Sequence, residues 1–338
     1  MWQTIGQGQA VRLLQTSITN GHLSHAYLFV GPHHVGKMTL AQDLAQAVNC
    51  KAEERPCTQC VSCRRIATGK HADVQVIGLL SEERAEIGID QIREMCAAAS
   101  LTPYEGKYKV FIIDGAEHLS TEASNSLLKT LEEPPPQVLL ILLTARERAL
   151  PTTIVSRCQK VALHPLSFEA TKEELSHKVK SPQAELLARL SGGCLGWALG
   201  VIQGEGQLHR RAERLDQLSA LEGASLQGRF SYAAELAADF SKDREKGREV
   251  LAMWLGWWRD LLLVKGGGDE YIANCDRKSI LQDRAQGYTL RQIKEFIVHL
   301  VEATEQLELN VNPRLVLEVL TLNMPQRHLA DSRQLTAR

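Results

Sequence analysis

The sequence lacks any hydrophobic run long enough to span a membrane. Its longest apolar stretches, such as residues 138–143 and 261–264, fall far short of the roughly 20 residues that a spanning helix needs. The N-terminus also lacks the basic segment, apolar core and cleavage site of a secretion signal. We therefore expect a cytoplasmic protein, and in that reducing compartment its eight cysteines do not favour disulfides.

The sequence also lacks an excess of charge of either sign. The formal net charge is -1 over 338 residues, and there is no long basic block. This balance argues against a protein that is drawn to nucleic acid by its overall charge. What is present is 44% hydrophobic residues, enough for two or three domains with buried cores.

Residues 1–165 alternate helical patterns with short apolar segments. Such alternation is typical of a parallel sheet covered by helices on both faces. The expected strands are residues 26–30, 74–77, 110–113 and 138–143, each bounded by glycine, proline or charged residues.

After about residue 165 the sequence predicts only helices. A small helical domain is expected over residues 166–206, with a break at Ser181-Pro182 and a helix around 184–190. Residues 207–338 are expected to form a helical bundle, with a loop at 266–268. Within this bundle three tryptophans lie at helical spacings, a stripe that favours core packing over an interface: Trp254, Trp257 and Trp258.

The first chemical motif is a P-loop pattern at residues 31–37, which follows an expected strand and opens an expected helix. Gly31 and Gly36 let the backbone wrap a phosphate, and Lys37 supplies a cation to the terminal phosphates. A plain glycine-rich turn is the alternative. The next residue is Met38, where a working loop places a serine or threonine to ligate magnesium.

An acidic residue ends the third expected strand. Asp114 stands where P-loop enzymes hold magnesium through water. The following residue is Gly115, where working ATPases of this type carry a glutamate that activates water. Glu117 lies two residues further along and would have to reach back around a turn, so we expect it to be a solvated residue at a helix start.

Four cysteines follow the P-loop helix closely, with the spacing C-x6-C-x2-C-x2-C. Four thiolates so near one another in the sequence fit a tetrahedral zinc ion, with no open position for catalysis. An iron–sulfur cluster and unligated buried cysteines are the alternatives. The predicted metal ligands are Cys50, Cys57, Cys60 and Cys63.

The order of these motifs resembles the bacterial clamp-loader AAA+ proteins. The resemblance also rests on the strings at residues 23–29, 125–135 (NSLLKTLEEPP), 143–144 and 151–159 (PTTIVSRCQ). It covers residues 1 to about 200 with specific motifs, and the rest by architecture and length. It implies an AAA+ P-loop domain over 1–165 with a zinc module at 50–63, a helical lid domain over 166–206 and a helical collar domain over 207–338, and it places Thr144 at the end of the sensor-1 strand.

Two subunit types share these motifs, an ATP-hydrolysing gamma/tau type and a stator type that does not hydrolyse ATP. Met38, Gly115 and Gly196 replace the magnesium ligand, the water-activating glutamate and the sensor-2 arginine, and these losses favour the stator type. ATP and magnesium are then expected to bind weakly or not at all at Gly31, Gly36, Lys37, Asp114 and Thr144.

The resemblance further implies that Arg157 is an arginine finger for the ATP of a neighbouring subunit. An ordinary surface arginine is the alternative. The implied function is loading of the sliding clamp onto primed DNA during replication by DNA polymerase III. The implied partners are the gamma/tau and delta subunits and, through the complex, the clamp and DNA. The chain alone is expected to be neither a polymerase nor an efficient ATPase; an active gamma/tau-type ATPase and a zinc-dependent DNA-binding module remain as alternatives.

Overall fold

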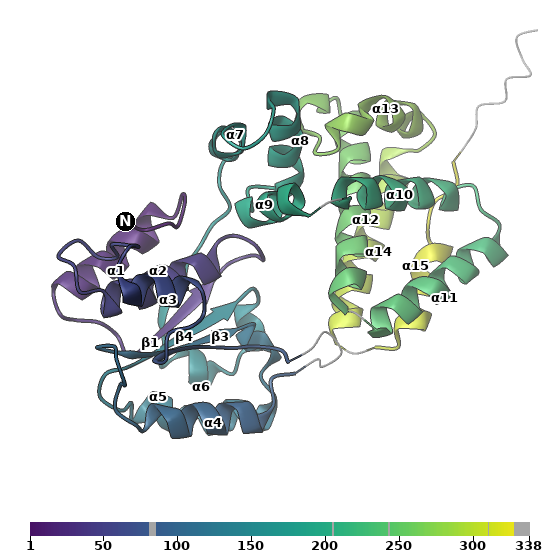
Figure 1. Cartoon of the computed structure of the whole chain (residues 1–338). Helices are drawn as coiled ribbons and strands as arrows, with labels where there is room; N and C mark the ends of the chain where they lie inside the picture. The colour runs from purple at the N-terminus through teal and green to yellow at the C-terminus, as the bar shows by residue number, and fades with distance from the viewer. Residues whose placement is uncertain (81–85, 205, 243, 310, 328–338) are drawn as a thin grey trace, which may run out of the picture. The chain divides into compact units, whose positions relative to one another are not determined.

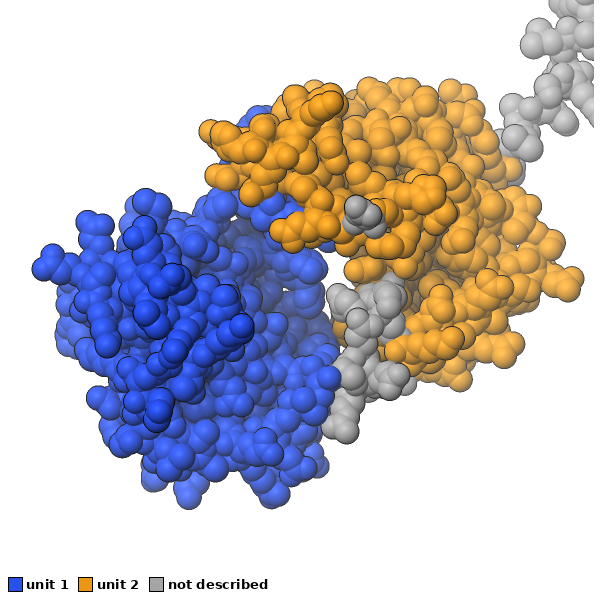
Figure 2. Space-filling view, viewed as in Figure 1, with its two compact units in different colours: residues 1–171, 193–199 blue, residues 172–192, 200–338 orange. Residues whose placement is uncertain are grey.

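The computed structural model describes residues 1–80, 86–204, 206–242, 244–309 and 311–327. The chain divides into two compact units, coloured separately in Figure 2. The first contains residues 1–171 and 193–199, and the second contains residues 172–192 and those from 200 onward. The three-part division at 165 and 206 stays a prediction. Within the described ranges, no helix is both long and apolar enough to cross a membrane.

The first unit is built on a five-stranded parallel sheet with the strand order β2-β3-β4-β1-β5. The strands are β1 (Ala26–Val30), β2 (Val74–Ile77), β3 (Lys109–Asp114), β4 (Val138–Thr144) and β5 (Gln159–Ala162). The first four confirm the sequence prediction to within one residue at each end. The edge strand β5 was not predicted, because Val161 is its only buried residue and the others are polar or small and exposed.

Helices cover both faces of this sheet, as Figure 1 shows. Alternate strand residues point to opposite faces, so Phe29 of β1 enters one core and Leu28 enters the other. The first core is closed by α1 (Gly8–Thr19), α2 (Lys37–Asn49) and α3 (Val61–Ala67), and the second by α4 (Ile89–Ala99), α5 (Thr121–Glu132) and α6 (Thr152–Val155).

From residue 166 onward the regular elements of the described chain are all helical, which confirms the predicted loss of strands. The α-helices are α7 (Phe168–Ser176), α8 (Ser181–Ser191), α9 (Leu195–Gln203), α10 (Gln207–Leu221), α11 (Leu226–Lys242), α12 (Arg244–Lys265), α13 (Lys278–Gln286), α14 (Leu290–Glu308) and α15 (Pro313–Leu322). The break at Ser181-Pro182 is the first turn of α8, where proline is tolerated. The glycines at 266–268 connect α12 to a short 3-10 helix, as predicted.

The tryptophan stripe of α12 lies in the core of the second unit. All three side chains are buried, and the ring of Trp258 packs against Phe296 of α14 with centroids 4.6 Å apart. Trp254 stacks on Tyr232 of α11 at 5.9 Å. The prediction of core packing is therefore confirmed, and the stripe acts by holding α11, α12 and α14 together.

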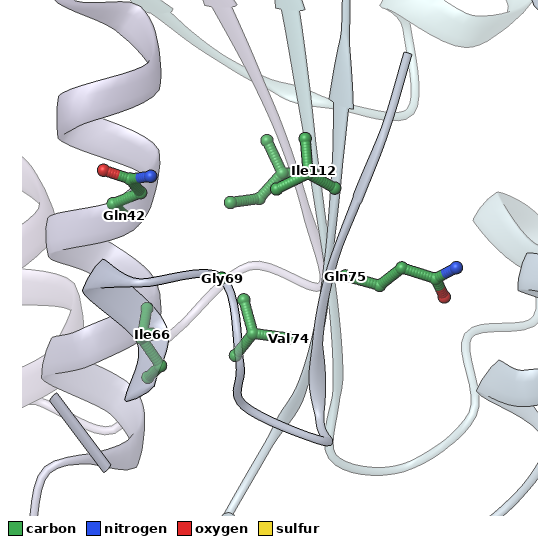
Figure 3. A pocket seen from close by; sticks show the side chains of 7 residues that line it. Gln42, Ile66, Gly69, Val74, Gln75 and Ile112 are labelled. Carbon is green, nitrogen blue, oxygen red and sulfur yellow. The ribbon is translucent and has the colours of Figure 1, made fainter. Parts of the chain in front are cut away.

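A pocket of about 280 Å³ opens beside the edge strand β2, between that strand and helices α2 and α3 (Figure 3). Figure 3 shows Ile66 and Val74 on one side of the strand and Gln75 extending to the other. The lining residues are Gln42, Ile66, Gly69, Val74, Gln75, Val76 and Ile112. Because none of these side chains is an acid, a base or a metal ligand, the pocket is separate from the chemistry described below.

Candidate functional site

The P-loop lies between the end of β1 and the start of α2, where the sequence places it. Gly36 is the residue before the helix and has φ +107, a conformation that favours glycine. His34 also has a positive φ of 61. The backbone N–H of Gly31 donates to the carbonyl of Thr144 at 3.1 Å, which ties the loop to the end of β4. The loop therefore has the expected position at the carboxyl edge of the sheet.

The lysine of this loop points back at the loop itself. Its Nζ donates to the carbonyl oxygens of Gly31 at 2.6 Å and Pro32 at 2.8 Å, and only 9% of Lys37 is exposed. Burial lowers the pKa of Lys37, and the nearby carboxylates of Glu117 and Asp114 oppose that shift. The ammonium group thus satisfies carbonyls of its own chain.

The two residues predicted to disable metal ligation and water activation have structural roles. Met38 is partly buried and packs against the core beneath α1 and α2. Gly115 has φ +73, and a Cβ there would lie 3.0 Å from the ring of His118. A glutamate at this position would have to adopt a left-handed backbone conformation, and its Cβ would need space that the ring of His118 occupies.

The turn at Gly115 brings Glu117 to the site, contrary to the prediction of a solvated residue. Glu117 lies in a 3-10 helix, η1 (Ala116–His118), and its Oε1 accepts the N–H of Ala145 at 3.0 Å. Desolvation opposes its ionisation, but the N–H groups of Glu117 itself and of Ala145 outweigh that effect and lower the pKa of Glu117. The sequence signal for this placement was the glycine before it, which permits the turn.

Asp114 and Thr144 end neighbouring strands, as the sequence predicts. Asp114 is the last residue of β3, where desolvation raises its pKa and Lys37 acts in the opposite direction. Thr144 is fully buried, and its Oγ1 accepts the N–H of Arg146 at 3.0 Å. The structure therefore brings Gly31, Gly36, Lys37, Asp114 and Thr144 together at one edge, with Glu117 added.

The segment 193–199 closes over the loop. The N–H of Gly196, the residue at the sensor-2 position, donates to the carbonyl of His34 at 3.0 Å. A Cβ on Gly196 would lie 2.7 Å from that same oxygen, closer than a carbon and an oxygen can approach. The backbone of this segment thus occupies the place from which an arginine would have to extend.

Arg157 lies away from this loop, after the short helix α6. Its Nη2 donates to Oε1 of Glu132 at 2.7 Å, and its Nη1 donates to the carbonyl of Thr153 at 2.9 Å. The Arg157 side chain is 36% exposed and the Glu132 side chain 51%. Glu132, the last residue of α5, was not singled out from the sequence, because nothing in the order of residues links positions 25 apart.

The four predicted cysteines gather at one point between α2 and α3. Their sulfur atoms all lie within 4.8 Å of one another. The N–H of Cys60 donates to Sγ of Cys57 at 3.3 Å, and the N–H of Cys63 donates to Sγ of Cys60 at 3.4 Å. N–H donors, with the bond from Cys60 contributing most, lower the pKa of Cys57 to about 6. The cluster is therefore compatible with a structural zinc ion.

Two family models match this chain. One, described as DNA polymerase III, delta subunit, matches residues 6–167, and one described as DNA polymerase III, delta subunit, C terminal matches residues 207–325. DNA polymerase III subunit delta′ of Bacillus subtilis is 30% identical over 322 residues, which cover 95% of this chain and 96% of that protein. This chain belongs to the DNA polymerase III delta′ family.

Other relatives match over part of their own length or by fold. DNA polymerase III subunit tau of Bacillus subtilis is 27% identical over 95% of this chain, but the match covers 61% of tau. A gamma subunit-related protein of known structure from Thermotoga maritima aligns over 92% of this chain and 98% of its own, with 17% identity and a TM-score of 0.48. The predicted membership of the clamp-loader family is confirmed by the delta′ match.

Proposed function

We propose that this chain is the stator-type subunit of a clamp loader, and that it supplies Arg157 to ATP bound by a neighbouring subunit. In this role it takes part in loading the sliding clamp of DNA polymerase III onto primed DNA in the cytoplasm. One observation carries the proposal: Lys37 is 9% exposed and bonded to the carbonyls of Gly31 and Pro32, whereas the side chain of Arg157 is 36% exposed. The cation available to a nucleotide is therefore the one outside the P-loop.

The chain's own P-loop is proposed to bind ATP and magnesium weakly or not at all. Two of the three hydrogens of the Lys37 ammonium group are already donated to loop carbonyls, which leaves one for a triphosphate. The carbonyl of His34 already accepts the N–H of Gly196, and Met38, which is partly buried against the core, offers magnesium no hydroxyl ligand. Each of these features is expected to weaken the binding of ATP and magnesium relative to a working P-loop.

Arg157 is proposed to act when water attacks the γ-phosphorus of the neighbour's ATP. As the bond between the γ-phosphorus and the bridging oxygen breaks, negative charge spreads over the phosphoryl oxygens and the leaving ADP. A guanidinium in contact with these oxygens stabilises that charge, an effect of about 10³ to 10⁵ in rate for arginine fingers in general. The attacking water and its base belong to the neighbour, so this chain contributes one group to the reaction.

The cysteine cluster is proposed to hold structural zinc. In a tetrahedral site with Zn–S bonds near 2.3 Å, the sulfurs lie about 3.8 Å apart, so the cluster needs only a small contraction from its 4.8 Å limit. Metal analysis of the purified chain should find one zinc per chain, and Cys57→Ser with Cys60→Ser should remove it. Cys275→Ser is the matched control, because Cys275 lies outside the cluster; iron in place of zinc would contradict the assignment.

The C-terminal helices are proposed to contact the gamma/tau and delta subunits. Arg229 of α11 donates to the carbonyls of Thr321 and Met324, so the start of α11 lies beside the end of α15. Both helices carry exposed apolar side chains. Those residues are Leu226 and Phe230 on α11 and Leu315, Val319 and Leu322 on α15. Such a face favours burial against another subunit.

The alternative function is an ATP-hydrolysing gamma/tau-type subunit, and a titration separates the two. The purified chain is titrated with labelled ATP, with and without magnesium, and phosphate release is measured in parallel. We expect no saturable magnesium-dependent binding in the low micromolar range and no hydrolysis above the blank. Tight, magnesium-dependent binding with turnover would establish the gamma/tau-type reading and contradict the stator proposal.

A further inference from the structure

The contact between Arg157 and Glu132 joins two segments that are both fixed by the core. Leu131, next to Glu132, and Ile154, three residues before Arg157, are buried in the same cluster beneath the sheet. The N–H of Arg157 donates to the carbonyl of Ile154 at 3.1 Å. The backbone on both sides of the ion pair is therefore held in place, although the two side chains are exposed.

The guanidinium is held at two points. Its Nη2 donates to Oε1 of Glu132 at 2.7 Å, and its Nη1 donates to the carbonyl of Thr153 at 2.9 Å. A guanidinium is planar and rigid, so two contacts on different nitrogens fix the direction of the whole group. Without Glu132, only the Thr153 carbonyl and a long contact at 3.4 Å to Oγ of Ser156 would remain among the described residues.

The same geometry leaves donors for a phosphate. A guanidinium has five N–H bonds. Within the described part of the chain, the contacts above use both hydrogens of Nη1 and one hydrogen of Nη2 at most. The N–H of Nε and one hydrogen of Nη2 remain, and each can donate to an oxygen of a phosphoryl group. Glu132 can therefore keep its contact while Arg157 engages phosphate.

We infer that Glu132 is a positioning residue for Arg157, which it orients toward the phosphates of a neighbouring subunit's ATP. This inference rests on the proposed function of Arg157. Glu132 touches no reacting atom. It acts by restricting the guanidinium to the orientation that the transition state needs, so its loss lowers the rate of hydrolysis and leaves ATP binding on the neighbour unchanged.

The test uses the clamp-loader complex reconstituted with the full chain. kcat and KM for ATP are measured for Glu132→Ala, Glu132→Gln, Arg157→Ala and the double variant Glu132→Ala with Arg157→Ala. Glu133→Ala is the matched control, because Glu133 is the neighbouring exposed carboxylate and has no contact with Arg157. The thermal midpoint of each isolated variant is measured in parallel.

We expect Glu132→Ala to lower kcat about tenfold with KM unchanged, since misplacing a catalytic group costs one to two orders of magnitude. Glu132→Gln keeps an acceptor oxygen and should fall between Glu132→Ala and the unsubstituted chain. Glu133→Ala should match the unsubstituted chain. Once Arg157 is alanine, removing Glu132 should cause no further loss, because a positioning residue has no effect without the group that it positions.

The outcomes separate the inference from the proposed function. If Arg157→Ala lowers kcat but Glu132→Ala does not, or raises it, the positioning role is overturned and the finger stands. Equal losses in Glu132→Ala and Glu133→Ala would also overturn it, since a general charge effect would explain both. A lowered thermal midpoint in Glu132→Ala with additive losses in the double variant would show a structural role instead. If Arg157→Ala has no effect, the proposed function itself fails.

Discussion

Two basic side chains of this molecule are candidates to act on ATP, and the protein holds them in opposite ways. Lys37 is buried, and two carbonyls of its own loop accept its hydrogens. Arg157 is exposed and is held by one carboxylate and one carbonyl at the surface. Exposed ion pairs are worth about 0 to 1 kcal/mol, so the contact with Glu132 can orient the guanidinium of Arg157 without withdrawing it from the surface.

This difference matches the proposal that the P-loop of this chain is inactive while Arg157 acts on a neighbouring subunit. The P-loop pattern at residues 31–37 is present with Met38 after it, and the cation of the loop donates to carbonyls of the chain itself. Arg157 lies at the surface, which the contribution to another subunit's ATP proposed above requires. Whether a conserved-looking motif still acts on a ligand is therefore decided by the partners of its side chains.

The largest expected effect comes from removing the exposed cation. Arg157→Ala should lower the DNA-stimulated ATPase rate of the reconstituted complex by about 10³-fold, because charge on the transferring phosphoryl group loses its guanidinium. Arg157→Lys keeps the charge without the planar fork and should retain part of the rate. Steady-state phosphate release measures the rates of both variants. A change of less than twofold in Arg157→Ala would show that Arg157 does not act on ATP.

A smaller effect is expected at the contact between Gly196 and the His34 carbonyl, beside the P-loop. Gly196→Ala forces a Cβ to within 2.7 Å of the His34 carbonyl and should lower the free energy of unfolding by about 2 kcal/mol. Gly200→Ala is the matched control, since it lies in the same helix with no atom within 4 Å of an added Cβ. Denaturant unfolding of the isolated chain gives the free energy of unfolding of each variant. Equal values for the two variants would show that the segment 193–199 can move away from His34 at no cost.

The smallest effect is a dependence of stability on pH that comes from Lys37. Burial lowers the pKa of Lys37 in the folded chain below its ordinary value near 10.4. Between the folded and unfolded pKa values the unfolded chain binds more protons, so stability rises with pH across that window. Relative to Lys37→Met, the unsubstituted chain should gain stability from pH 7 to pH 10. The groups facing Lys37 are Glu117, Asp114 and Cys194, and a flat difference would contradict its burial as a cation.

The sequence predicts most strands and motifs of this fold well because each of them depends on a short, continuous segment of the chain. Four strands are found within one residue of their predicted ends, since short, mostly apolar segments between glycine, proline and charged residues favour strands at that length. β5 is missed because an edge strand with one buried residue carries almost no such pattern. The P-loop, the Asp114 strand and the four cysteines are local in the same sense.

The site is less predictable because its decisive contacts join residues far apart in the chain. Glu117 reaches Ala145 through a turn that depends on the conformation of Gly115. Glu132 meets Arg157 only because α5 and α6 pack together. The sequence shows that the sensor-2 position holds Gly196 in place of an arginine. The close approach of Gly196 to the His34 carbonyl is visible only in the structure. Composition and spacing therefore identify the absent catalytic residues more readily than the contacts that are formed at their positions.

The approach of Gly196 to His34 also bears on how an ATP-hydrolysing site could arise in this chain. Regaining a nucleotide-binding cation at position 196 by a single substitution would place a side chain where a carbonyl oxygen now lies. The segment 193–199 would have to withdraw first, and that movement brings no benefit until Met38 and Gly115 have also changed. If the chain has the stator role proposed above, several substitutions that are each unfavourable alone separate it from an ATP-hydrolysing site, so a single substitution is not expected to create one.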